Sequence, residues 1–185
     1  VGSENWCCVY WLSCYFYCEI FINNRLAMTQ VFINGARDDL NVREFQSLDP
    51  SIQEIILAAT EARKQAYCPY SNFAVGAALR TSDGTIYSGC NIENGAYATC
   101  ICAERTAAVK AISEGKRDFV ACAVVAQQDN GFTTPCGVCR QFLSEFVNGK
   151  DIPLYAAKPT NLPLRVLCTS VLQLLPNGFS FANGK

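Results

Sequence analysis

Two short segments of the chain combine residues that can hold a metal ion and move protons. One is Cys102-Ala103-Glu104-Arg105, and the other is Pro135-Cys136-Gly137-Val138-Cys139-Arg140. Each lies where a loop enters a predicted helix, whose free N–H groups and positive dipole end favour thiolate, the metal-binding form of cysteine. Cys136 and Cys139 are three residues apart and can face one point, and Cys102 can supply a third sulfur. Three ligands leave the fourth tetrahedral position open for water, which is typical of a catalytic zinc site.

Glu104 stands two residues after a predicted zinc ligand, on the first turn of its helix. From there its carboxylate can reach the open position, take a proton from water, and deliver protons to a substrate and a leaving amine. An isolated glutamate at a helix start would more simply complement the helix dipole. Because Glu104 follows Cys102 and a Pro-Cys-x-x-Cys segment lies downstream, we favour the catalytic role.

Arg105 and Arg140 have an electrostatic reason to lie near such a site. Zinc with three thiolates carries a net negative charge, which would weaken its ability to acidify water. A guanidinium that donates to the sulfurs would offset this charge. The alternative for each is a solvated surface arginine, and for Arg140 both interpretations stay open.

The chain has twelve cysteines and no histidine. The absence of histidine excludes a Ser-His-Asp triad, a Cys-His nucleophile and every histidine-ligated metal site. The formal net charge is −1 and no long basic run occurs, which disfavours a polynucleotide substrate and fits a small neutral one. Helix and strand patterning throughout argues against a secreted disulfide framework. We therefore expect free thiols in a reducing, cytoplasmic compartment.

Helices and strands alternate along the chain around these segments. A helix capped by Asp49, with Pro50 at its first position, is predicted to run to about Tyr67. Further helices are expected over 102–114 and 136–147, with a last helical turn or two over 170–175. Strands are expected over 73–80, 85–90, 119–126, 152–157 and 165–168. This alternation predicts an α/β sandwich with a mixed sheet.

Residues 1–48 show no comparable order, and we expect them to be an N-terminal extension, either non-native or disordered, before a catalytic domain at 49–185. The stretch from Trp6 to Ile22 is apolar and aromatic, with Glu19 as its one charge, but it is short for a membrane span. A signal peptide would need a starting methionine and a basic region, and neither is present. The simplest interpretation is that residues 1–27 are upstream sequence that is not part of the natural protein.

The two cysteine segments resemble the signature of the cytidine deaminase family. The resemblance extends over about Ser51 to Phe179, through the segments Tyr67–Leu79 and Gly89–Asn94 and through Leu174-Leu175-Pro176 with Phe179. It implies a three-layer α/β/α sandwich with a mixed, roughly five-stranded sheet. It also implies hydrolysis of cytidine and 2′-deoxycytidine to uridine and 2′-deoxyuridine, in pyrimidine salvage, with one zinc ion per subunit. Relatives that act on deoxycytidylate or tRNA use a histidine ligand, so the chain resembles the three-cysteine, homotetrameric nucleoside branch.

The resemblance also implies roles for substrate-binding residues. Asn91 and Glu93 would hydrogen-bond the ribose hydroxyls, and Phe73 would pack against the pyrimidine. Ala103 would offer its backbone N–H to the base, Glu104 would contact the ring nitrogen, and Tyr97 would be lent to a neighbouring subunit's site. From the residues alone, Phe73 is a core aromatic and the segment 91–94 is a polar turn.

The pattern departs from the family at two positions of one loop. Cys100 stands where the family commonly has glycine, and Gly95 stands where it commonly has alanine. Cys100 is the one fourth thiol of this loop, so a structural zinc knot is an alternative, although we expect Cys100 to be a bystander. Two further alternatives are a nucleoside-antibiotic deaminase of the blasticidin type and a redox dithiol formed by Cys136 and Cys139.

Overall fold

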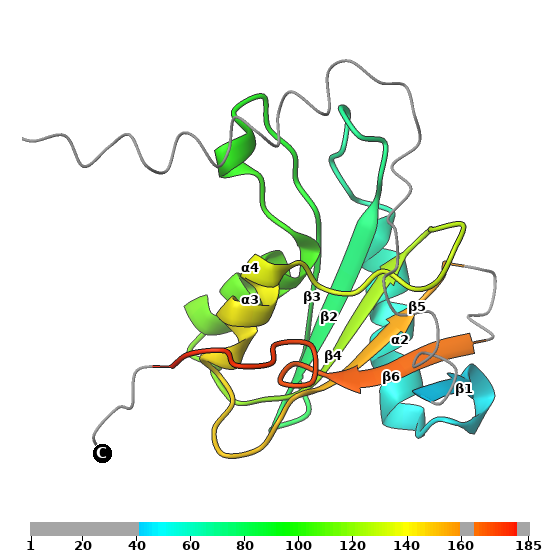
Figure 1. Ribbon diagram of the computed structural model, residues 1–185, viewed down its shortest axis with the longest axis vertical. Coiled ribbons are helices and arrows are strands. Elements are labelled where there is room, and N and C mark those ends of the chain that lie inside the picture. The colour runs from blue at the N-terminus through cyan, green and yellow to red at the C-terminus, as the bar shows by residue number, and fades with distance from the viewer. Residues whose placement is uncertain (1–40, 160–164, 181–185) are drawn as a thin grey trace, which may run out of the picture. The chain divides into compact units, whose positions relative to one another are not determined.

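A computed structural model describes residues 41–159 and 165–180, which belong to one compact unit spanning residues 36–185. The apolar stretch at residues 6–22 and most of the predicted extension lie outside the described residues. The unit is built on a six-stranded sheet with the order β1-β6-β5-β4-β2-β3 (Figure 1). Its strands are β1 (Val42–Glu44), β2 (Val75–Thr81), β3 (Ile86–Cys90), β4 (Phe119–Ala126), β5 (Pro153–Ala157) and β6 (Arg165–Ser170). Within the described part, β4 and β5 pair in parallel and the other neighbours are antiparallel, so the sheet is mixed.

Helices cover both faces of this sheet (Figure 1). Helix α2 (Pro50–Arg63) packs on one face, and α3 (Ala103–Ser113) and α4 (Gly137–Ser144) lie side by side on the other. Successive residues of β4 show the division, because Val125 is buried in the core under α2 whereas Val124 is buried in the core under α3 and α4. The predicted three-layer sandwich is confirmed.

Among the described strands, β1 is the one that the sequence did not predict. It pairs antiparallel with β6, and Phe45 and Leu48, which follow it, are buried in the core under α2. Three residues are too few to show the alternation that marks a strand. The sheet therefore has six strands rather than five. Its edge strand β1 belongs to the segment 1–48, which we expected to lie outside the catalytic domain.

Element ends differ from the predicted ends by a few residues. Helix α2 stops at Arg63 and not at Tyr67, because the backbone N–H of Tyr67 donates to Asn91 O (3.0 Å) and its carbonyl accepts from Glu93 N (2.7 Å). The predicted helix over 136–147 ends at Ser144. The last helical turn or two predicted over 170–175 is shorter than expected: β6 continues to Ser170, and residues 171–174 form a turn that the backbone N–H of Leu174 closes on Ser170 O at 3.2 Å. None of the described helices is long and apolar enough to cross a membrane.

Gly76 allows helix α2 to approach strand β2 closely. A Cβ atom at this position would lie 2.0 Å from the carbonyl oxygen of Ala59 and 2.6 Å from the backbone nitrogen of Arg63. Backbone atoms cannot rotate away as a side chain can, so Gly76→Ala should lower the free energy of unfolding by about 3 kcal/mol or more. Chemical denaturation measures this change. Gly137→Ala is the matched control, because no atom other than those of its chain neighbours and its own helix backbone lies within 4 Å of a Cβ there. Equal stability of the two variants would contradict the packing described.

Candidate active site

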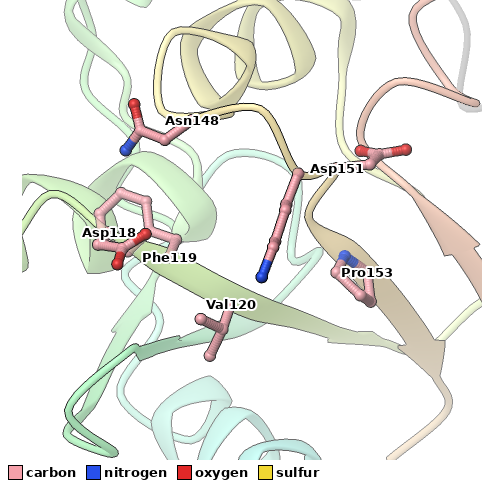
Figure 2. A pocket seen from close by; sticks show the side chains of 7 residues that line it. Asp118, Phe119, Val120, Asn148, Asp151 and Pro153 are labelled. Carbon is pink, nitrogen blue, oxygen red and sulfur yellow. The ribbon is translucent and has the colours of Figure 1, made fainter.

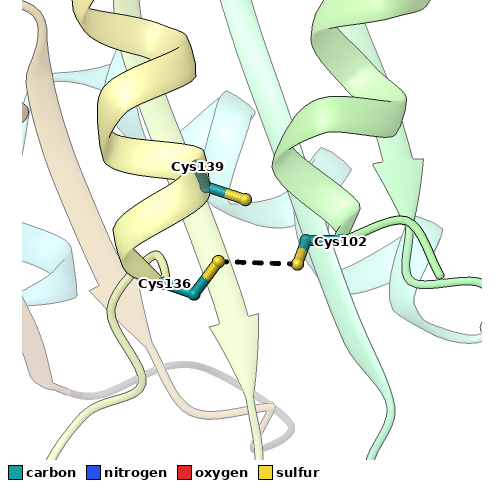
Figure 3. A group of neighbouring side chains, drawn as sticks. All are labelled: Cys102, Cys136 and Cys139. Atoms are coloured by element: carbon teal, nitrogen blue, oxygen red, sulfur yellow. Dashed lines mark hydrogen bonds between the residues drawn. The ribbon is translucent and has the colours of Figure 1, made fainter. Parts of the chain in front are cut away.

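Three cysteines meet where α3 and α4 begin. Cys102 is the N-cap residue of α3, Cys136 is the N-cap residue of α4, and Cys139 lies on the first turn of α4 (Figure 3). The three Sγ atoms all lie within 4.8 Å of one another, and those of Cys102 and Cys136 are 3.7 Å apart. Segments separated by more than thirty residues thus deliver three sulfurs to one point.

The spacing of these sulfurs suits a zinc ion. Zn–S bonds of about 2.3 Å set two sulfurs about 3.8 Å apart across a tetrahedron, close to the 3.7 Å between Cys102 and Cys136. Cys139 is fully buried, whereas Cys136 is exposed, so the cluster opens on one side. Cys100 does not belong to the cluster: its Sγ accepts from the backbone N–H of Asn94 at 3.2 Å. This arrangement disfavours a structural site with Cys100 as the fourth ligand.

The three thiols of the cluster share their protons unevenly. Hydrogen bonds from Cys102 and Cys139 hold the pKa of the Cys136 thiol far below its ordinary value, at about 2. Hydrogen bonds with Cys102 and Cys136 raise the pKa of the Cys139 thiol, and the hydrogen bond with Cys136 raises the pKa of the Cys102 thiol. The cluster therefore presents one ready thiolate, and a cation that binds must displace protons from the other two thiols.

Glu104 is buried on the first turn of α3, with 3% of its surface exposed. Burial, together with the negative charge of Cys136, raises the pKa of its carboxyl to about 7. Its carboxylate also hydrogen-bonds with the side chain of Cys139. A glutamate that only complements a helix dipole has no need to be buried beside a sulfur cluster, so the structure favours a role in proton transfer.

The two arginines of the signature have different partners. Arg105 Nη2 lies 3.7 Å from Cys102 Sγ and donates to the carbonyl oxygen of Cys100 at 3.2 Å, as expected for a residue that offsets thiolate charge. Arg140 donates to oxygen atoms of Pro135, Leu174 and Thr134, at 2.7, 2.8 and 3.0 Å. Arg140 is therefore not a solvated surface arginine, because it is half-buried. These hydrogen bonds also do not offset thiolate charge directly, because they go to oxygen and not to sulfur.

Asn91 and Glu93 hold together the loop that precedes β2. Asn91 accepts from the backbone N–H of Val75 at 2.8 Å and donates to the carbonyl oxygen of Phe73 at 2.9 Å. The carboxylate of Glu93 accepts from the backbone N–H groups of Tyr70 and Ser71, at 2.9 and 3.2 Å, and from the Ser71 hydroxyl. The segment 91–94 is therefore an organised bracket for residues 70–75 and not a free polar turn.

Aromatic side chains on these loops remain exposed. Phe73 is 38% exposed, which excludes the core position that its sequence alone predicts. Tyr97 is 48% exposed, and its ring centroid lies 6.0 Å from that of Tyr70.

The backbone N–H of Ala103 is the group that the resemblance assigns to the base. Ala103 is buried at the first position of α3, where a backbone N–H has no partner within the helix.

The structure also has a hollow of about 250 Å³ (Figure 2). It is bordered by Phe119 at the start of β4, by Pro153 at the start of β5, and by Lys150 between them. No cysteine lines it. Among the described residues, the one group of three or more side chains that could hold a metal ion is the cysteine cluster where α3 and α4 begin.

Comparison with known proteins identifies the family. The model of the cytidine and deoxycytidylate deaminase zinc-binding region matches residues 50–154. The chain belongs to this deaminase family. A cytidine deaminase of Sporosarcina psychrophila is 53% identical over 129 residues, which cover 70% of this chain and 91% of the relative. A probable cytidine deaminase of Dictyostelium discoideum is 43% identical, covering 70% and 84%. The crystal structure of the Burkholderia pseudomallei cytidine deaminase matches with a TM-score of 0.62 and 45% identity, covering 68% of this chain and 97% of the other.

Membership explains the grouping of residues at the start of α3 and α4. The family model is named for a zinc-binding region, and it spans all three clustered cysteines and Glu104. The deaminase resemblance drawn from the sequence is confirmed, and so is the expectation of a zinc-binding domain.

Proposed function

We propose that the chain hydrolyses cytidine and 2′-deoxycytidine to uridine and 2′-deoxyuridine, consuming one water and releasing one ammonia. The observation that carries this proposal is the buried carboxyl of Glu104 beside a three-sulfur cluster that suits zinc. Cys102, Cys136 and Cys139 would hold one zinc ion per subunit. The product nucleosides would enter pyrimidine salvage in the cytoplasm.

Glu104 would do the proton transfer. Zinc, when bound, supplies the Lewis acidity that makes water a nucleophile near neutral pH. The Glu104 carboxylate takes a proton from the water that attacks C4 of cytosine and gives it to N3. It then passes the second proton to the exocyclic amine, so that ammonia leaves. A carboxyl whose pKa lies near 7 can accept and release protons at the pH of the cytoplasm.

The bracket of Asn91 and Glu93 would bind the ribose. An asparagine amide has two donor hydrogens and two acceptor positions, and one of each is used within the chain. A carboxylate accepts about four hydrogen bonds, and Glu93 accepts three. Each residue thus keeps capacity for a sugar hydroxyl without releasing the loop. Phe73 would pack against the pyrimidine, and the backbone N–H of Ala103 would bind the base.

Ser71 links Glu93 to the loop that it holds. Its hydroxyl donates to the Glu93 carboxylate and accepts from the backbone N–H of Phe73 at 3.0 Å. Ser71→Ala removes both bonds and leaves Glu93 less well held. We expect KM for cytidine to rise roughly tenfold, as for the loss of one hydrogen bond to a charged group, with kcat almost unchanged. Steady-state kinetics measures this. Ser113→Ala, at an exposed hydroxyl of α3, is the control. An unchanged KM in Ser71→Ala would contradict the assignment.

We further propose a homotetramer in which Tyr97 enters a neighbouring subunit's site, and a deaminase domain at 49–185 to which residues 42–48 add the edge strand β1 and two core side chains. Support comes from exposed apolar side chains beside the site, on the first turn of α4 and on the neighbouring loops, namely Val138, Tyr70, Ile92, Tyr97 and Ile101. Tyr97→Ala mixed with an inactive Glu104→Gln protein tests the shared site. If the tyrosine acts across an interface, mixed oligomers should regain part of the activity that neither parent has.

Competition between substrates tests the choice of a pyrimidine nucleoside over a nucleoside antibiotic. Purified zinc-loaded protein is given cytidine, deoxycytidine and blasticidin S together, and the products are separated by chromatography. We expect uridine and deoxyuridine to form first, because Asn91 and Glu93 suit a true ribose. Turnover of the antibiotic alone would show that the substrate is wrong although the chemistry is right.

A further inference from the structure

Arg140 ties three separate parts of the chain together behind the metal cluster. Its Nε donates to the carbonyl oxygen of Pro135, its Nη2 to the hydroxyl of Thr134, and its Nη1 to the carbonyl oxygen of Leu174. Pro135 is fully buried and directly precedes Cys136. The guanidinium therefore holds the turn from which the Cys136 sulfur projects.

The C-terminal segment that supplies Leu174 O is itself held against the rest of the fold. Val171 is fully buried, and its backbone N–H donates to Ile152 O at 3.0 Å at the edge of β5. The backbone N–H of Leu174 donates to Ser170 O at 3.2 Å, and its side chain packs against the core under α3 and α4. The neighbouring Gln141 donates to Phe179 O at 2.8 Å. The C-terminal segment 171–179 is thus joined to α4 by two successive side chains.

Arg105 occupies the corresponding place on α3, directly behind its own cysteine segment. Arg105 and Arg140 each reach back five residues, to the carbonyl of Cys100 and to that of Pro135. Arg105 also contacts a sulfur, whereas the three hydrogen bonds of Arg140 go to oxygen atoms. The two residues therefore act differently: Arg105 can offset thiolate charge, and Arg140 can fix geometry.

We infer that Arg140 is a positioning residue, which sets the placement of Cys136 for zinc by clamping the Thr134–Pro135 turn to the C-terminal segment at Leu174. The inference rests on the proposed zinc site but not on the proposed substrate. A planar guanidinium serves three acceptors in fixed directions, and a lysine ammonium cannot reproduce this fork. A pure charge effect on the thiolates, in contrast, would survive replacement by lysine.

Arg140→Lys separates the two explanations. We expect its zinc affinity, measured by competition with a chelator, to fall roughly ten- to hundredfold, as is common when a residue supporting a metal ligand is changed. In the Co²⁺-loaded variant, the visible d–d bands should shift or broaden, because the sulfurs no longer hold one geometry. Neither readout needs catalysis, so the inference can stand or fall separately from cytidine turnover.

Arg80→Lys is the matched control. Arg80 also donates to three acceptors, Gly84 O and Ser51 O at 3.0 Å each and the carboxylate of Glu54, but it lies on β2 away from the cysteines. It should lose comparable thermal stability while keeping the wild-type zinc affinity and Co²⁺ spectrum. Two results would overturn the inference: wild-type zinc affinity and spectrum in Arg140→Lys, or equal losses of zinc affinity in the two variants.

Discussion

Replacing Glu104 by glutamine should abolish deamination while leaving zinc in place. Glutamine keeps the size of the side chain but cannot accept and release a proton, and general acid–base catalysis contributes about 10²–10⁴-fold to such reactions. Because Glu104 is buried, the neutral amide should also be tolerated by the fold. We therefore expect kcat to fall at least 10²-fold, with one zinc per chain by metal analysis and an unchanged melting temperature.

Glu114→Gln is the control for this change. Glu114 ends the same helix, is exposed, and accepts from the hydroxyl of Tyr87 at 2.8 Å, which glutamine can still do. The control should keep wild-type activity. A Glu104→Gln protein that turns over cytidine at the wild-type rate would remove Glu104 from the mechanism, and loss of zinc from it would make Glu104 part of the metal site instead.

Replacing Cys102 by alanine should release the metal. Cys102 is the one member of the cluster that comes from α3, so its loss leaves the two sulfurs of α4 alone. We expect zinc content to fall well below one per chain after dialysis, and activity to fall with it. The measurement is metal analysis together with turnover on the same sample.

Cys100→Ala separates the cluster from its neighbour in the same loop. The Cys100 sulfur bonds to the backbone of Asn94, so this variant should keep zinc and most activity. If Cys100→Ala lost zinc as fully as Cys102→Ala, Cys100 would be a fourth ligand and the site would be structural. Full zinc in Cys102→Ala would show that the ligand assignment is wrong.

Local sequence patterns were sufficient to predict most of the sheet and the cluster. The apolar run that forms β4 predicted its bounds without error, because a central strand is buried on both faces. The three cysteines could be grouped because each lies at the start of a helix, where the thiolate that binds metal is favoured. Helix ends were harder to predict, since a pairing far along the chain, Tyr67 with Asn91, decides where α2 stops.

Backbone acceptors explain what the sequence could not show. Arg140 binds two carbonyl oxygens, and every residue has a carbonyl, so no side-chain type signals the partner. The same holds for Glu93, which accepts two of its three hydrogen bonds from backbone N–H groups. The burial of Glu104 depends on how α3 lies on the sheet, which only the folded chain reveals.

The most direct test is the ultraviolet absorbance of cytidine mixed with the purified, zinc-loaded full chain. We expect the absorbance to fall as uridine forms, with one ammonia released for each cytidine consumed. A folded protein with one zinc per chain that leaves both cytidine and deoxycytidine unchanged would contradict the proposed function.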